Sequence, residues 1–305
     1  MELEYSCEVA IAGLTIAFCT CRKVEWPESF QPFRTDMNPD YKVFFRETTH
    51  IPGHISNPVF IRDNILITTG ENQNTFVRWF RDPEKKEAPY AYSSIELSSK
   101  TVNVFYLRTA EKMLGYLDSC FSYIAWETLL MHEKRLLLHS SFVASPYGGI
   151  LFSGVSGIGK STQADLWCRF RGCRLLNGDR TILHFEDDRL TGYGSPYAGS
   201  SKCYVNDSCT IRILVFLQKS TECRVRKLRK AEVFRNIYAQ LTVNSWDKKF
   251  VQFACDMAER IADTIPVYEL SCTPDLKAVE LLEKVLQGGR SIWREIDLKN
   301  RFSEP

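Results

Sequence analysis

The 305-residue sequence predicts an α/β protein, α+β when taken as a whole, in which a β-rich part precedes a P-loop domain. Three observations predict this fold: strand-like runs separated by turns at the start, a change to helical spacing, and then a mixture of strands and helices around a glycine-rich loop. We therefore divide the chain into a β-rich N-terminal domain (1–109), a connecting helix (110–135), a P-loop domain (136–290) and a tail (291–305).

The N-terminal domain contains short runs rich in β-branched and aromatic residues, which favour strands. Turn signals such as Asn57-Pro58 and Asp82-Pro83 separate these runs. The predicted strands cover residues 3–10, 14–18, 41–46, 59–68, 90–97 and 101–107.

Apolar residues follow helical spacing over residues 110–134, for example Leu114, Leu117, Phe121 and Ile124. This spacing predicts one long helix that joins the two domains, with its aromatic positions in the core.

The predicted strands of the P-loop domain cover residues 136–144, 149–153, 174–176, 181–185, 211–217 and 267–270. The predicted helices cover residues 162–171, 230–243, 247–264 and 274–286, and Gly288-Gly289 is a typical helix stop. The polar tail after Arg290 is expected to be loosely held.

Residues 154–161 read Gly-Val-Ser-Gly-Ile-Gly-Lys-Ser, a complete match to the phosphate-binding pattern G-x-x-x-x-G-K-[ST]. A strand is predicted before this loop and a helix after it, so the helix dipole would favour an anion there. The Lys160 ammonium would lie near the β- and γ-phosphates of ATP, and the Ser161 hydroxyl would ligate Mg²⁺. The predicted nucleotide-binding residues are Gly154, Ser156, Gly157, Ile158, Gly159, Lys160, Ser161 and Thr162.

The sequence around the loop resembles a known family. Leu138-His139-Ser140-Ser141-Phe142-Val143 leads into the loop, and Arg171-Gly172-Cys173-Arg174-Leu175-Leu176-Asn177-Gly178-Asp179-Arg180 follows its helix. Over residues 136–220 this is similar to the kinase domain of bacterial HPr serine kinase/phosphorylase, whose nucleotide-binding core is shared with phosphoenolpyruvate carboxykinase. The resemblance implies phosphoryl transfer from MgATP, and it makes a homo-oligomer an expectation. The Gly- and Arg-rich signature found further along those kinases is missing, so their target protein is not implied.

The resemblance also implies roles for three residues near the loop. The family has two adjacent aspartates, one proposed as the base and one that helps to hold Mg²⁺. Asp179 matches the second, whereas Gly178 stands in place of the first, so the identity of the base stays open. His139 matches a family histidine close to the phosphates that would orient or deprotonate the attacking hydroxyl; a hydrogen-bonded core histidine is the alternative. Arg180 would neutralise the transferred phosphoryl group or form an ordinary ion pair.

Residues 193–202 form a turn-rich stretch of small and hydroxyl side chains between two predicted strands. A loop of this kind can close over a substrate, in which case Lys202 would reach a phosphate. Ordinary loop chemistry explains the composition equally well.

Composition excludes several classes of function. Lysine and arginine number 39 against 37 acidic residues, so the net charge of +2 gives no electrostatic reason to expect a nucleic-acid partner. No run of 18 apolar residues exists, so we expect no membrane span. The start of the chain is acidic and the 11 cysteines form no C-x-x-C pair, which favours a cytoplasmic protein with reduced thiols.

The sequence therefore predicts an ATP-dependent kinase in which His139, Lys160, Asp179 and Arg180 act on the phosphoryl group and Ser161 and Asp179 hold the metal. The acceptor would be a hydroxyl group of a peptide, a protein or a small molecule. A nucleotide-binding regulator with little catalysis is the alternative, motivated by Gly178. A carboxykinase reaction on oxaloacetate is disfavoured, because the chain is short for that family and its second-metal ligands are missing.

Overall fold

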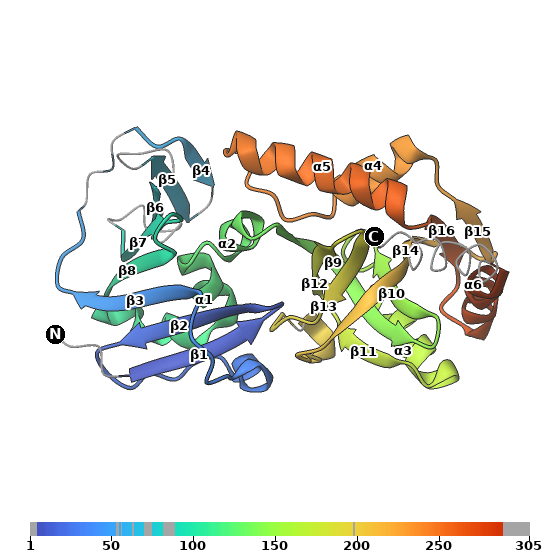
Figure 1. Cartoon of the computed structure of the whole chain (residues 1–305), viewed down its shortest axis with the longest axis horizontal. Helices are drawn as coiled ribbons and strands as arrows, with labels where there is room; N and C mark the ends of the chain where they lie inside the picture. The colour runs from blue at the N-terminus through green and yellow to red at the C-terminus, as the bar shows by residue number, and fades with distance from the viewer. Residues whose placement is uncertain are drawn as a thin grey trace, which may run out of the picture.

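The computed structural model describes residues 5–52, 55, 57–62, 64–69, 75–81, 89–197 and 199–288. Within them the chain forms two lobes that lie side by side, each built on an eight-stranded sheet (Figure 1). The fold is thus a mixed α/β arrangement. The expected tail, 291–305, lies outside the described residues. None of the helices in the described part of the chain is long and apolar enough to cross a bilayer.

The N-terminal lobe is a sheet in the order β1-β2-β3-β8-β7-β6-β5-β4. Neighbouring strands in this sheet are antiparallel, with two exceptions: β3 is parallel to both of its neighbours, β2 and β8. Burial alternates along the strands, so one face of the sheet packs into the core. The strands are β1 (Tyr5–Ile11), β2 (Leu14–Thr20), β3 (Tyr41–Thr48), β4 (Phe60–Arg62), β5 (Ile65–Thr69), β6 (Thr75–Phe80), β7 (Ala91–Glu96) and β8 (Thr101–Leu107).

Two features of this sheet differ from the sequence prediction. The run expected over residues 59–68 is two strands, β4 and β5, that pair as a hairpin. Strand β6 was not predicted, because its inward-facing Arg78 interrupts the apolar alternation. Arg78 is buried and forms an ion pair with Glu127, which makes a charge tolerable at that position.

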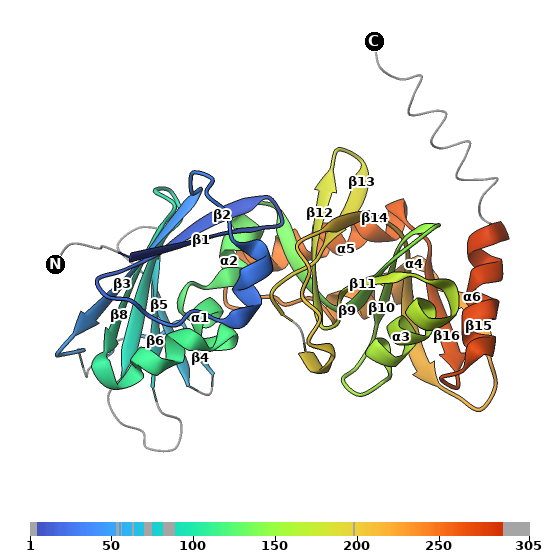
Figure 2. The same cartoon turned by 90° about the horizontal axis from the view of Figure 1, so that it is seen from below.

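The prediction of a single connecting helix over residues 110–135 is wrong. The structure has three pieces: a 3₁₀ helix η2 (Arg108–Gly115), α1 (Leu117–Tyr123) and α2 (Trp126–His132). The breaks fall at Tyr116, whose backbone is extended, and at Ala125, whose φ of 52° is left-handed. The breaks let both short helices turn their aromatic residues into the core. With the 3₁₀ helix η1 (Glu28–Phe33), they fill the space between the N-terminal sheet and the second lobe (Figure 2).

The second lobe has the strand order β10-β9-β12-β13-β14-β16-β15, with β11 beside β9 and a further pairing between β10 and β14. The strands are β9 (Arg135–Ser145), β10 (Gly148–Ser153), β11 (Arg174–Asn177), β12 (Arg180–Glu186), β13 (Arg189–Tyr193), β14 (Ser208–Lys219), β15 (Arg224–Lys227) and β16 (Val267–Cys272). Strand β9 pairs with β12 over its first half and with β10 and β11 over its second half. Strand β13 was not predicted.

Helices cover both faces of this sheet. The helices α3 (Lys160–Arg171) and α6 (Leu276–Gly288) pack on one face, and α4 (Lys230–Tyr238) and α5 (Lys248–Thr264) pack on the other (Figure 1). The helix predicted over 230–243 is shorter because the following residues pair with β9: the amide of Thr242 donates to the carbonyl oxygen of Leu137 at 3.0 Å. This pairing brings the 240–242 segment beside the middle of β9.

Three neighbouring strands, β10, β14 and β16, run parallel, so their carboxyl ends meet at one edge of the sheet. Ligands of open α/β sheets bind at such edges. The glycine-rich loop follows β10 directly and is therefore placed at this edge.

Candidate functional site

The loop of residues 154–159 connects β10 to α3 and depends on the backbone freedom of glycine. Gly154, Gly157 and Gly159 have φ values of 137°, 73° and 110°, which L-residues rarely adopt. Gly159 is the residue before α3, and no side chain caps the first turn of that helix. The strand, the tight loop and the helix predicted from the sequence follow one another directly, and the structure adds that the start of the helix has no side-chain cap.

Lys160 lies inside this loop with only 8% of its surface exposed. Its ammonium donates to the carbonyl oxygens of Gly154 at 3.1 Å and Val155 at 3.3 Å. Burial lowers the pKa of Lys160, and the nearby Asp179 carboxylate opposes that shift. The cation is thus held at the loop by carbonyl oxygens that a phosphate could replace.

The other predicted loop residues differ in exposure. Ser156, Gly157 and Thr162 are exposed, whereas Ile158, Gly159 and Ser161 are half-buried. The exposure of Ser156, Gly157 and Thr162 leaves them accessible to a ligand.

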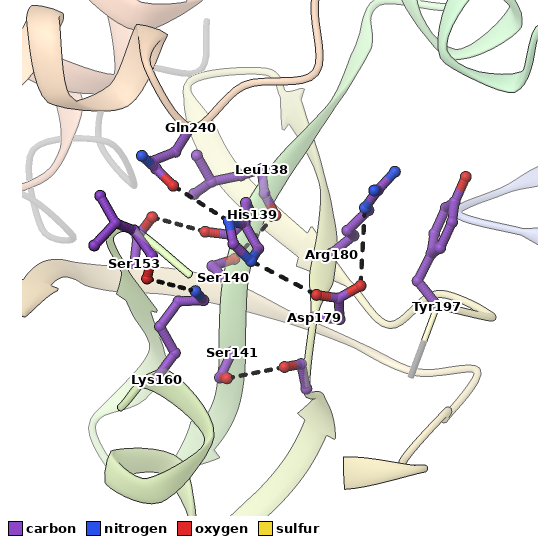
Figure 3. A network of polar contacts seen from close by, with 12 residues as sticks. Leu138, His139, Ser140, Ser141, Ser153, Lys160, Asp179, Arg180, Tyr197 and Gln240 are labelled. Atoms are coloured by element: carbon purple, nitrogen blue, oxygen red, sulfur yellow. Dashed lines mark hydrogen bonds and ion pairs between the residues drawn. The ribbon is translucent and has the colours of Figure 1, made fainter. Parts of the chain in front are cut away.

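A charged cluster lies next to Lys160 and brings together the other predicted residues. His139 on β9 is directly opposite Arg180 on β12 in the sheet register. The Asp179 carboxylate lies between them, with Oδ1 at 3.7 Å from His139 Nε2 and Oδ2 at 3.8 Å from Arg180 Nε (Figure 3). All three side chains are between 30% and 39% exposed, so a ligand can reach them.

The turn that carries Asp179 is organised by Asn177, which is fully buried. Its Oδ1 accepts from the amides of Asp179 at 2.9 Å and Arg180 at 2.8 Å. Its Nδ2 donates to Ser195 and to the carbonyl oxygen of Tyr197 at 2.6 Å. Sequence reasoning missed Asn177, although an Asn-Gly-Asp turn is a recognisable signal for such an amide bridge.

A second missed residue is Gln240, which lies beside His139 in the segment that pairs with β9. The amide of His139 donates to the carbonyl oxygen of Gln240 at 2.9 Å, and His139 Nδ1 lies 3.3 Å from Gln240 Oε1. Because Oε1 can only accept, Nδ1 carries the proton in this contact and Nε2 faces Asp179. Burial, and next the charge of Lys160, lower the pKa of His139, with Asp179 and Gln240 opposing. No sequence signal links residues so far apart.

The loop predicted over residues 193–202 reaches the charged cluster through packing. The Arg180 guanidinium lies 4.7 Å from the centre of the Tyr197 ring, and that ring packs on Phe121 of α1 at 5.3 Å. Gly199 approaches Asp179 so closely that a Cβ there would lie 3.0 Å from Asp179 Cβ. Lys202, proposed from the sequence to reach a phosphate, is exposed.

Ser161 and Asp179 supply the kind of ligand that Mg²⁺ prefers. A hydroxyl and a carboxylate are hard oxygen donors, and Mg²⁺ usually combines one or two such groups with phosphate oxygens and water. No group of three or more His, Cys, Asp or Glu side chains that could hold a metal occurs within the described ranges. The two oxygen donors, Ser161 and Asp179, are of the type that Mg²⁺ accepts together with phosphate oxygens and water.

Comparisons with known proteins identify no family. No family model matches the chain, and no curated protein matches it. Among solved structures, the chain is similar to the HPr(Ser) kinase/phosphatase from Coxiella burnetii, with 16% identity and a TM-score of 0.33 over 55% of this chain and 99% of that one.

Proposed function

We propose that the protein binds MgATP on residues 154–161 and transfers the γ-phosphoryl group to a hydroxyl acceptor. The observation that carries this proposal is the cluster of His139, Asp179 and Arg180, which two paired strands and a bridged turn place beside Lys160. Phosphoryl transfer requires positioning and charge neutralisation more than covalent participation of the protein. The paired strands and the bridged turn support positioning, and the Lys160 and Arg180 cations support charge neutralisation.

The roles follow from the charges. Lys160 leaves its loop carbonyls and binds the β- and γ-phosphate oxygens, and Arg180 neutralises charge on the phosphoryl group as it moves. Ser161 and Asp179 would hold Mg²⁺, which shields the phosphate charge. A neutral His139 accepts the acceptor's hydroxyl proton at Nε2 while Gln240 holds the Nδ1 proton. The acceptor oxygen then bonds to the γ-phosphorus as the bond to the bridging oxygen of ADP breaks.

Label transfer from γ-labelled ATP tests this proposal on the purified full chain with peptide, protein and small-molecule hydroxyl acceptors. Lys160→Ala should abolish nucleotide binding and transfer, whereas His139→Ala should retain binding and lose transfer. Lys248→Ala, which removes an exposed lysine at the start of α5, is the matched control and should behave as wild type. Transfer or hydrolysis that is the same in wild type and Lys160→Ala contradicts the proposal.

A nucleotide-binding regulator is the second candidate. Gly178 leaves one carboxylate in the turn, and Lys160 already has carbonyl partners in its own loop. Tight MgATP binding in calorimetry, with no turnover in the label-transfer assay, would favour this candidate. Gly178→Asp would then be informative, because it adds the missing carboxylate at a position whose φ is not positive.

A further inference from the structure

A cavity of about 630 Å³ opens beside the phosphate-binding loop. Three segments line it: the loop and first turn of α3, the end of β14 with the residues that follow it, and the residues after β16. These are the carboxyl ends of parallel strands, where α/β proteins bind ligands. Its volume lies within the range typical of small-molecule sites.

The cavity and the charged cluster lie on opposite sides of the loop. Strand β10, which leads into the loop, has β9 as one neighbour and β14 as the other. His139 on β9 and the Asp179 turn stand on the first side, and the cavity stands on the β14 side. A nucleotide with its phosphates on the loop therefore has one direction for its γ-phosphate and the other for its nucleoside.

The lining suits a nucleoside. Ile158, Leu217 and Pro274 supply apolar wall for a planar ring, and Ser220, Thr221 and Thr273 bring hydroxyl groups that match the polarity of ribose. A second cavity, of about 440 Å³, is lined by the ion-paired Lys230 and Asp263, among others, and its lining includes no residue of the loop.

One wall residue, Gln163, has an incomplete set of hydrogen bonds. It is only 2% exposed, and its Nε2 donates to the Cys272 sulfur at 3.2 Å. Its Oε1 is buried with no hydrogen-bond partner among the described residues. A buried amide oxygen without a partner is unfavourable, and the last torsion of glutamine is soft. A rotation of the carboxamide toward the cavity would let Oε1 accept from a ligand donor.

We propose that this cavity binds the base and ribose of the nucleotide, and that Gln163 Oε1 accepts a hydrogen bond from an exocyclic amino group, which selects adenine. This inference rests on the proposed function, because it requires the phosphates to lie on residues 154–161. It adds the nucleoside site, the direction of the nucleotide and the residue that recognises the base.

Filling the cavity tests the nucleoside site. Thr221→Trp places a large ring at an exposed position of the cavity wall, and Thr210→Trp makes the same change at an exposed position near the opposite end of β14. Binding is measured by calorimetry with MgATP and with magnesium tripolyphosphate, which has no nucleoside. Thr221→Trp should weaken MgATP at least tenfold and leave tripolyphosphate within twofold, and Thr210→Trp should change neither. MgATP affinity within twofold of wild type in Thr221→Trp overturns the site.

Base selection has its own test. Wild type should prefer MgATP over inosine triphosphate, which carries an oxygen in place of the amino group, by at least tenfold, and Gln163→Leu should reduce that ratio to below threefold. An unchanged ratio in a Gln163→Leu protein that still binds MgATP overturns the role of Gln163. Failure of the proposed function is distinguishable: wild type would then bind neither tripolyphosphate nor MgATP in a Lys160-dependent manner.

Discussion

Gln240 offers a sharp test of the site, because it contacts His139 and belongs neither to the glycine-rich loop nor to the turn that carries Asp179. The two side chains meet at 3.3 Å between His139 Nδ1 and Gln240 Oε1. Gln240→Leu removes the acceptor, and Gln240→Glu replaces it with a negative charge of nearly the same shape. The two variants should move the pKa of His139 in opposite directions.

The magnitudes follow from the contact. Both the neutral ring and the imidazolium donate from Nδ1, so the pKa of His139 responds only to the difference between a charged hydrogen bond, about 1.5–3 kcal/mol, and a neutral one, about 0.5–1.5 kcal/mol; because the charged bond is the stronger, the leucine variant should lower the pKa of His139. An adjacent carboxylate contributes about 4 kcal/mol at an effective dielectric constant of 20, and solvent reduces this because the His139 side chain is 31% exposed. We expect the glutamate variant to raise the pKa of His139 by about 1–2.

The direction in which each variant shifts the pH dependence of kcat/KM follows from the role of His139 as a base, because only the neutral ring can accept a proton. Burial lowers the pKa of His139 below its usual value in the wild type, so kcat/KM should fall only when the pH drops through that lowered value. The acidic limb should move to lower pH in Gln240→Leu and to higher pH in Gln240→Glu.

Nuclear magnetic resonance gives a readout that does not depend on catalysis. The ring signal of His139 is followed against pH and is assigned by its loss in His139→Asn, since the chain has five histidines. Gln252→Leu, at an exposed glutamine of α5 that donates to Asp256, is the matched control and should leave the titration unchanged. A His139 titration that moves the same way in both Gln240 variants, or in neither, would refute the assigned contact.

Three further predictions concern the turn and the core. Gly199→Ala should reduce transfer at least tenfold by displacing Asp179, whereas Gly172→Ala, with a similar φ but no atom within 4 Å of the added Cβ, should lose stability alone; steady-state kinetics and thermal melts separate the two. Asn177→Leu removes a fully buried amide that bridges two segments, so urea denaturation should show a loss of about 3 kcal/mol, and a loss below 1 kcal/mol would contradict that role. Burial raises the pKa of Cys7 to about 12, so iodoacetamide at pH 8 should modify it only after denaturation, which peptide mass spectrometry measures.

The features predicted well from the sequence are those that depend only on residues adjacent in the chain. The glycine-rich loop is one run of eight residues, and its glycines adopt φ values that L-residues rarely reach, so the sequence pattern located the tight turn between β10 and α3. Strand β8 likewise alternates buried and half-buried residues along its own length. In both cases the information needed is local.

The features that were missed depend on partners distant in sequence. Arg78 faces inward on β6 because Glu127 of α2 neutralises it, and a charged residue at an inward position argues against a strand when that partner is unknown. The break at Ala125 requires a left-handed backbone at an alanine, and the position carries no glycine or proline that would indicate a helix break from the sequence. Gln240 reaches His139 only because its segment pairs with β9.

The division of the chain at residue 136 also separates residues that the structure joins. Tyr197 belongs to the core of the N-terminal lobe, where its ring packs on Phe121. The Arg180 guanidinium packs over the same ring. A fragment that begins at residue 136 would lack Phe121 and would expose much of an aromatic ring that is now 8% exposed. Because Asn177 ties the backbone of Tyr197 to the amide of Asp179, loss of that packing would reach the charged cluster directly. The glycine-rich loop of residues 154–159 is local to the second lobe, but the Arg180 guanidinium packs on a ring that belongs to the core of the N-terminal lobe.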